Sequence, residues 1–121
     1  MKSCLIVEDS KVIRMVARKI LQGLEFNTSE AADGRKALDA CKAQLPDAVL
    51  LDCEMPIMDG LGFLIELRKL PGGEVPVVVF CTTETDIEHI QKALECGANE
   101  CIMKPFDSGS LQAVFNQVGL L

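Results

Sequence analysis

The sequence contains no tryptophan, no tyrosine and only one histidine among its 121 residues. With a single histidine and no C-x-x-C pair, it lacks the ligand spacing of a zinc finger. No apolar run reaches the roughly 18 residues of a membrane-spanning helix. The opening segment also lacks the long apolar core of a secretory signal, because Glu8 and Asp9 interrupt it. We therefore expect a cytoplasmic protein without membrane insertion.

Basic residues are outnumbered as well. The chain has 12 lysines and arginines against 18 aspartates and glutamates, a formal net charge of −6. Nonspecific binding to nucleic acid needs a basic surface that displaces counterions, so direct nucleic-acid binding is not expected. The six cysteines lie in apolar segments. We interpret them as reduced, mostly buried small side chains rather than as a disulfide framework.

What the chain does contain is typical of one globular domain. Hydrophobic residues make up 49% of it and charged residues 25%, which argues against disorder. The length suits a single domain with a sizeable core. We found no linker, low-complexity run or internal repeat. We therefore expect one domain over residues 1–121, with no effector domain attached and with signalling through protein contacts.

Short apolar segments alternate with segments of helical period. Nearly continuous apolar runs are typical of strands covered on both faces, as in a parallel sheet, and such runs predict strands at 4–8, 48–52 and 75–81. Residues 26–30 and 100–103 are weaker strand candidates. Capping residues, glycines and prolines delimit helices at 11–23, 35–44, 60–70, 85–97 and 108–118. An apolar stripe in the fourth helix, formed by Ile87, Ile90 and Leu94, is expected to face the core. Five alternations predict a doubly wound α/β fold.

Residues suited to phosphoryl chemistry stand where four of these strands end, namely Glu8-Asp9, Asp52, Thr82 and Lys104. The carboxyl ends of strands in an open α/β sheet meet at one edge, where ligands bind. Carboxylates can form acyl phosphates, so Asp52 is a candidate phosphoryl acceptor. Taken alone, Asp52 could equally well do no more than cap a strand.

The other residues complete a pocket for magnesium and a phosphoryl group. Glu8 and Asp9 would repel Asp52 unless a cation lay among them, and Mg²⁺ prefers such carboxylate ligands. The Thr82 hydroxyl could donate to a phosphoryl oxygen, and the Lys104 ammonium could pair with one. Individually these residues are ordinary features of a surface. Their occurrence at four strand ends favours the functional interpretation.

The surrounding motifs resemble the receiver domain of two-component response regulators, nearest to the stand-alone, CheY-like type. They are Glu8-Asp9, Asp52 followed by Met55-Pro56 and Asp59-Gly60, Thr82, and Lys104-Pro105-Phe106. The resemblance covers essentially the whole chain. It implies a flavodoxin-like fold, with a five-stranded parallel sheet in the order 2-1-3-4-5 and five helices.

The resemblance also implies a mechanism. A histidine kinase or a histidine phosphotransfer protein would transfer a phosphoryl group to Asp52. The Asp9 and Asp52 carboxylates and the Glu54 main-chain carbonyl would hold Mg²⁺, with Glu8 helping through water. The phosphorylated form would bind a downstream protein through the face of the fourth helix, fifth strand and fifth helix. Such a protein is a phosphoacceptor switch that catalyses only its own phosphorylation and dephosphorylation.

Three positions depart from the family pattern or refine it. An aromatic residue commonly stands three positions before the pocket lysine, but here that residue is Cys101, which is too small to act as an aromatic lever. Phe80 and Phe106 are candidates to take over part of that motion. Glu54 and Glu84, two residues after Asp52 and Thr82, are candidates to tune the phosphoryl lifetime. The single histidine, His89, is expected on the surface of the fourth helix.

Two other functions fit part of this pattern. Aspartate-nucleophile phosphohydrolases also use an aspartate after a strand, followed by a Ser/Thr and a lysine. In those enzymes, however, the acid pair closes the series of motifs, whereas here it comes first. A flavin-binding electron carrier would need a phosphate-cradling loop after the first strand and aromatic residues beside the ring. The segment Glu8-Asp9-Ser10 would instead repel a phosphate in the absence of a metal.

Overall fold

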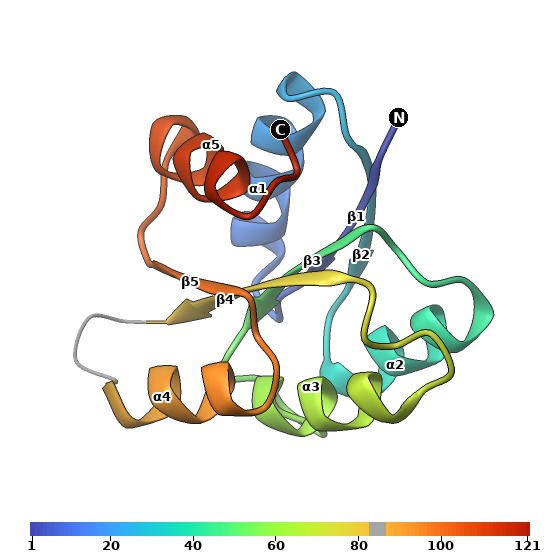
Figure 1. Cartoon of the computed structure of the whole chain (residues 1–121). Helices are drawn as coiled ribbons and strands as arrows, with labels where there is room; N and C mark the ends of the chain where they lie inside the picture. Colours follow the sequence, from blue (N-terminus) through green and yellow to red (C-terminus); the bar gives the residue numbers. More distant parts are fainter. Residues whose placement is uncertain (83–86) are drawn as a thin grey trace.

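A computed structural model describes residues 1–82 and 87–121. All five expected strands and all five expected helices are present, and they alternate along the chain (Figure 1). The strands are β1 (Ser3–Val7), β2 (Asn27–Ala31), β3 (Ala48–Asp52), β4 (Val77–Thr82) and β5 (Glu100–Met103). The helices are α1 (Lys11–Gly23), α2 (Gly34–Ala43), α3 (Gly60–Lys69), α4 (Ile87–Glu95) and α5 (Ser108–Gln117).

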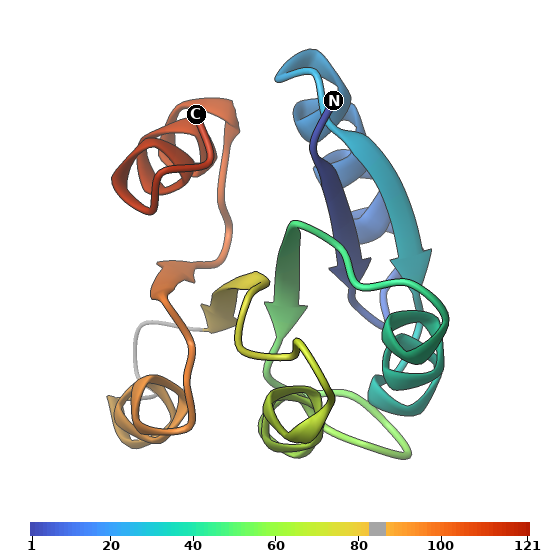
Figure 2. The ribbon, with the colours of Figure 1, turned by 45° about the vertical axis from the view of Figure 1, so that its right-hand side comes forward.

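The strands form one parallel sheet in the order β2-β1-β3-β4-β5, which confirms the predicted flavodoxin-like topology. Helices α1 and α5 cover one face of the sheet, and α2, α3 and α4 cover the other (Figures 1 and 2). The two-residue period of a strand supplies both cores. In β1, for example, Leu5 and Val7 pack toward α2 and α3, whereas Cys4 and Ile6 pack toward α1 and α5.

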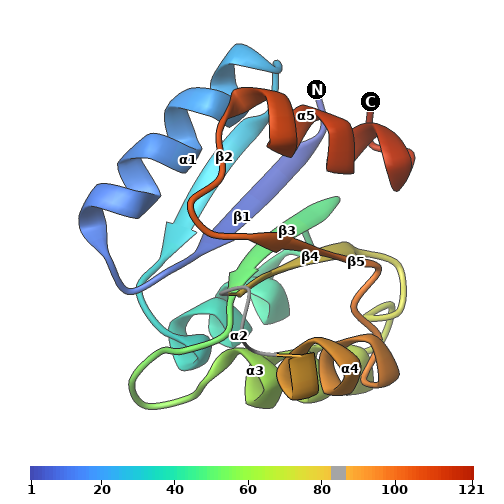
Figure 3. The same cartoon turned by 90° about the vertical axis from the view of Figure 1, so that its left-hand side faces the viewer.

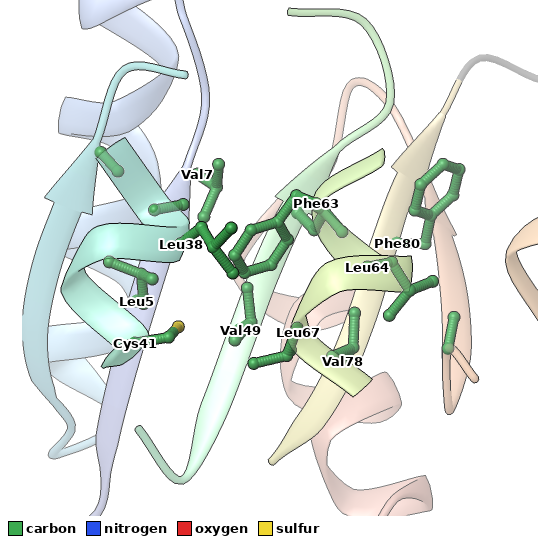
Figure 4. Close-up of a cluster of buried hydrophobic side chains, with 14 of the residues drawn as sticks. Leu5, Val7, Leu38, Cys41, Val49, Phe63, Leu64, Leu67, Val78 and Phe80 are labelled. Carbon is green, nitrogen blue, oxygen red and sulfur yellow. The ribbon is translucent and has the colours of Figure 1, made fainter. Parts of the chain in front are cut away.

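The larger core lies between the sheet and α2 and α3 (Figure 4). Phe63 and Leu67 of α3 are fully buried there against Val49 and Val78 of the central strands. On the opposite face, the rings of Phe26 and Phe115 meet edge to face, with centroids 5.3 Å apart. Each large side chain buried in this way contributes about 1.5–3 kcal/mol to folding. Helices on both faces therefore explain why the central strands are almost uninterruptedly apolar.

Most boundaries differ from the sequence prediction by one or two residues, and two of the differences have a clear structural basis. Strand β4 begins at Val77 rather than at residue 75, because Val75 is exposed and Pro76 has no N–H to donate to a neighbouring strand. Strand β1 ends at Val7, and the Glu8 N–H donates to the Ala31 carbonyl at 3.1 Å. The expected start of the fourth helix, Thr85, lies outside the described residues.

The predicted core stripe of the fourth helix is wrong. Ile87 and Leu94 are 64% and 45% exposed, Ile90 is half-buried, and the buried residue of α4 is Ala93. Helix α4 lies at the margin of its layer, where it contacts β4 and α3 (Figure 3). A small residue at the contact lets the helix approach closely, and the larger side chains on either side of it then remain in solvent. His89 is exposed on α4, as expected.

No disulfide links the six cysteines, all of which lie in the described part of the chain. Cys4, Cys41 and Cys81 are buried, and the other three are half-buried. Burial raises the pKa of Cys41 to about 11, so its thiol is protonated at neutral pH. In residues 1–82 and 87–121, no helix combines the length and the apolar character needed to span a bilayer. The cytoplasmic location stays a prediction.

Candidate functional site

The register of the sheet brings the predicted residues to one edge. Asp52, the last residue of β3, pairs with Cys81, and Thr82, the last residue of β4, pairs with Met103. Glu8 follows β1 directly and Lys104 follows β5 directly. Since all the strands run parallel, their carboxyl ends lie together. The edge encloses an open cavity of about 270 Å³, whose lining includes Glu8, Asp9, Asp52, Glu54, Thr82 and Lys104.

The centre of the cavity is an ion-pair triad. Lys104 Nζ donates to Glu8 Oε1 and to Asp52 Oδ1, each at 2.6 Å. The two acids are almost fully buried, at 4% and 5% exposed. Burial by itself would lower the pKa of Lys104, but its hydrogen bonds to Asp52 and Glu8 outweigh burial and raise that pKa above the usual value. The lysine is therefore a fixed positive charge beside Asp52.

The same surroundings act oppositely on Glu8. The pKa of this carboxyl is raised to about 7: burial is the largest cause, the hydrogen bond from Lys104 opposes it, and the neighbouring acids Asp9 and Asp52 add to the rise. The single ammonium group of Lys104 is thus insufficient to neutralise the acids around it. A second cation at this edge would stabilise the ionised form.

The acids are placed so that they could share a metal ion. Carboxylate oxygens of Glu8, Asp9 and Asp52 lie within 4.8 Å of one another. Three carboxylates and one ammonium leave a formal charge of −2, which a divalent cation would balance. Mg²⁺ takes oxygen ligands and is held by one or two carboxylates together with water. The donor set therefore fits Mg²⁺.

The loop after β3 explains the motif Asp59-Gly60. Asp59 caps α3, because its Oδ1 accepts from the Gly62 N–H at 2.8 Å. A Cβ on Gly60 would collide with the backbone oxygen of Asp52. The turn can therefore close tightly against the end of β3 only with glycine at this position. The motif that follows β5 contains a cis peptide bond between Lys104 and Pro105.

The remaining predicted residues occupy different places. Glu54 is exposed at the cavity, and Glu84 lies outside the described residues. Cys101 is half-buried beside its register partner Phe80 and packs against the core under α3. Phe106 packs against the core on the opposite face of the sheet. The two candidate rings therefore lie on opposite sides of the sheet.

Two residues at the site were not predicted from the sequence. Cys53 Sγ lies 3.7 Å from Thr82 Oγ1, and its position directly after Asp52 was the available signal. Arg14 Nη1 donates to the carbonyl oxygens of Glu8 and Asp9. The only sequence signal for Arg14 was its position near the start of the helix that follows the acid pair.

Comparison with known proteins places the chain in a family. Residues 4–116 match the response regulator receiver domain. The chemotaxis protein CheY of Halobacterium salinarum is 32% identical over 117 residues, which are 97% of this chain and 96% of that protein. The probable transcriptional regulator ycf27 of Porphyridium aerugineum is 35% identical over 114 residues. This match covers 94% of the chain but 46% of that regulator, so the chain spans less than half of its length.

Solved structures agree with this assignment. The chemotaxis response regulator CheY4 of Vibrio cholerae superimposes with a TM-score of 0.91 at 31% identity, over 98% of each chain. The receiver domain of a sensor histidine kinase from Pseudomonas aeruginosa has a TM-score of 0.88 at 28% identity, over 98% of each chain. That receiver has a magnesium ion coordinated in its active site cleft. The chain described here belongs to the response regulator receiver domain family of two-component systems and is CheY-like.

Proposed function

We propose that residues 1–121 act as a single receiver domain that accepts a phosphoryl group on Asp52 in a Mg²⁺-dependent reaction. The donor is a histidine kinase or a histidine phosphotransfer protein, and the product switches a protein–protein contact. The observation that carries this proposal is the ammonium group of Lys104, 2.6 Å from the buried Asp52 carboxylate at an acidic cavity. Receiver domains are phosphoacceptor switches and generally not enzymes, which favours this function over that of a phosphohydrolase.

The side chains divide the chemistry among them. A carboxylate oxygen of Asp52 attacks phosphorus, a new O–P bond forms, and the P–N bond to the donor imidazole breaks, with the electron pair leaving on nitrogen. Lys104, already charged beside Asp52, pairs with an oxygen of the arriving group. The Thr82 hydroxyl donates to another phosphoryl oxygen. These residues provide a preorganised charge environment for the transfer.

The acid cluster supplies the metal ligands. Asp9 and Asp52 would hold Mg²⁺ through their carboxylates and Glu54 through its main-chain carbonyl, while Glu8 would act through water. The proximity of the three carboxylates supports this assignment, as does the general binding of Mg²⁺ by receiver domains at an acidic site. When bound, Mg²⁺ would supply positive charge that neutralises the phosphoryl group beside the acceptor.

The output surface is the side formed by α4, β5 and α5 (Figure 3). Ile87 and Leu94 on α4 and Met103 on β5 are large apolar side chains left exposed there. A downstream protein docks on this side when Asp52 is phosphorylated, because phosphorylation changes the relative stability of two conformations. With Cys101 in place of an aromatic residue, this switch works without an aromatic lever.

The first test is the intact mass of the protein after incubation with acetyl phosphate, with and without Mg²⁺. We expect one phosphoryl adduct that requires Mg²⁺ and is absent from Asp52→Asn. An adduct that persists in Asp52→Asn would place the acceptor elsewhere. If folded protein forms no adduct, the same measurement is repeated with a phosphorylated histidine phosphotransfer domain as the donor, and failure with both donors would contradict the proposal.

Glu54 also tunes the lifetime of the product in this proposal, because its exposed side chain lies at the cavity where water reaches the acyl phosphate. Glu54→Asn is expected to change the half-life of the Mg²⁺-bound adduct by at least about twofold, which is only ~0.4 kcal/mol in the barrier. Glu66→Asn, at a half-buried position on α3 outside the cavity lining, is the control. An unchanged half-life would show that the Glu54 side chain points away from the cavity.

A further inference from the structure

Arg14 of α1 contacts the main chain of the loop that carries the acid pair. Its Nη1 donates to the Glu8 carbonyl at 2.7 Å and to the Asp9 carbonyl at 3.2 Å. The side chain is only 16% exposed. Hydrogen bonds from a charged donor to carbonyl oxygens are stronger than those from neutral donors. Arg14 therefore fixes the orientation of two successive peptide groups.

Arg14 is itself held from β2. Its Nε donates to Glu30 Oε1 at 3.2 Å, and the other carboxylate oxygen of Glu30 accepts from Arg18 Nη1 at 2.8 Å. The Glu8 N–H is bonded to the carbonyl of Ala31, also on β2. The acidic loop is thus anchored both to α1 and to β2, which lie side by side (Figure 3).

Resting on the function proposed above, we propose that Arg14 is a positioning residue for the divalent cation. Asp9 is exposed, so packing does not fix its carboxylate. Its direction depends on the peptide groups on either side of it, and Arg14 bonds the carbonyls of both Glu8 and Asp9. Outer partners that orient metal ligands typically contribute tenfold or more to metal affinity. Arg14 has this role through the main chain.

The sign of the effect separates positioning from simple electrostatics. Arg14 is a cation close to an acidic site, so its charge alone opposes the approach of Mg²⁺. Removing only that charge would tighten Mg²⁺ binding. Loss of the fixed loop orientation would weaken Mg²⁺ binding, because the carboxylates of Glu8, Asp9 and Asp52 would lie within 4.8 Å of one another less often.

The test compares Arg14→Ala with Arg18→Ala. Both arginines contact Glu30, but only Arg14 reaches the acidic loop, so Arg18→Ala controls for the loss of charge and of the shared ion pair. The Mg²⁺ dissociation constant is measured by calorimetry, and the Mg²⁺ concentration for half-maximal labelling by acetyl phosphate is measured in parallel. We expect both to rise about tenfold in Arg14→Ala and by less than about twofold in Arg18→Ala. In both variants, the rate of labelling by acetyl phosphate at saturating Mg²⁺ should stay near that of the unmodified protein.

Arg14→Lys provides a second variant, because it keeps the charge and the apolar stem but loses the fork that joins Glu30 to the two carbonyls. Arg14→Lys should bind Mg²⁺ at least a few-fold more weakly than the unmodified protein. This variant can be measured even if Arg14→Ala does not fold. Unchanged or tighter binding in the Arg14 variants would overturn the inference. Calorimetry keeps the two proposals apart: if the unmodified protein binds Mg²⁺ but is not labelled, the proposed function fails while the role of Arg14 is still tested.

Discussion

Cys53 and Thr82 are in contact at the phosphoryl cavity, with Cys53 Sγ 3.7 Å from Thr82 Oγ1. The thiol belongs to the residue directly after the proposed acceptor, and the hydroxyl lies at the buried end of β4. An S–H group is a weak donor. In this contact the thiol donates and the hydroxyl oxygen accepts, so the contact is compatible with donation from the same hydroxyl to a phosphoryl oxygen and would strengthen that donation.

Replacing this thiol should disfavour phosphorylation. In Cys53→Ala, the Thr82 oxygen loses a donor that strengthens donation from its hydroxyl to the phosphoryl group. A loss of ~0.6 kcal/mol, within the range for a weak hydrogen bond, would lower the phosphorylation equilibrium about threefold. The measurement is the fraction phosphorylated at a fixed, sub-saturating acetyl phosphate concentration, read by intact mass. Cys96→Ala, at a half-buried cysteine outside the cavity lining, should be unchanged, and a higher fraction in Cys53→Ala would contradict the prediction.

The titration of Glu8 makes the metal-free protein less stable as pH rises. The folded-state pKa of about 7 is above the ordinary value of 4.5, so between these values the folded state binds more protons than the unfolded state. Stability from this group is therefore fully present below about pH 4.5 and is lost as pH rises through about 7. Urea midpoints measured with EDTA at pH 5, 6, 7 and 8 should decline. In Glu8→Gln the urea midpoint should decline less steeply with pH. The same pH dependence in both proteins would show that Glu8 does not cause the decline.

Ile57 is held in a strained conformation on the loop after β3. Its φ is +70° and its side chain is 83% exposed, so an unfavourable left-handed backbone is combined with little burial. A β-branched residue is poorly suited to this region, whereas asparagine tolerates it. Ile57→Asn should therefore increase the free energy of unfolding by about 0.5–1 kcal/mol. Val75→Asn, at an exposed position without positive φ, should have almost no effect, and a destabilised Ile57→Asn would argue against strain.

Arg68 joins α3 to two loops beneath the sheet. Its guanidinium donates to the carbonyls of Gly73, Pro76 and Gly97 at 2.6–3.2 Å. Burial lowers its pKa from the usual value. Arg68→Ala would leave these carbonyls without their charged donor and should cost about 2–3 kcal/mol in urea unfolding. Lys69→Ala, the next residue, removes only an exposed ion pair with Glu66 and should cost less than about 1 kcal/mol. Equal losses in the two variants would refute the role of Arg68.

The sequence was sufficient for features that depend on local pattern. Three continuous apolar runs, two weaker strand candidates and the helix caps predicted ten elements, and the parallel topology then placed Asp52, Thr82 and Lys104 at one edge of the sheet. Strand ends meet there because parallel neighbours share direction. The start of β4 was less predictable, since Val75 is apolar like the strand that follows and only its exposure distinguishes it.

Only the tertiary structure decided how side chains distant in the chain meet. The pairing of Lys104 with Glu8 and Asp52 depends on register. The hydrogen bonds from Arg14 to the acidic loop depend on how α1 packs against β2. The exposure of Ile87 and Leu94 depends on α4 lying at the margin of its layer. Local sequence determines which face of an element is apolar and which residue ends it, because those properties repeat with the period of the backbone. Contacts between elements depend on relative placement, which the packing of the whole chain determines.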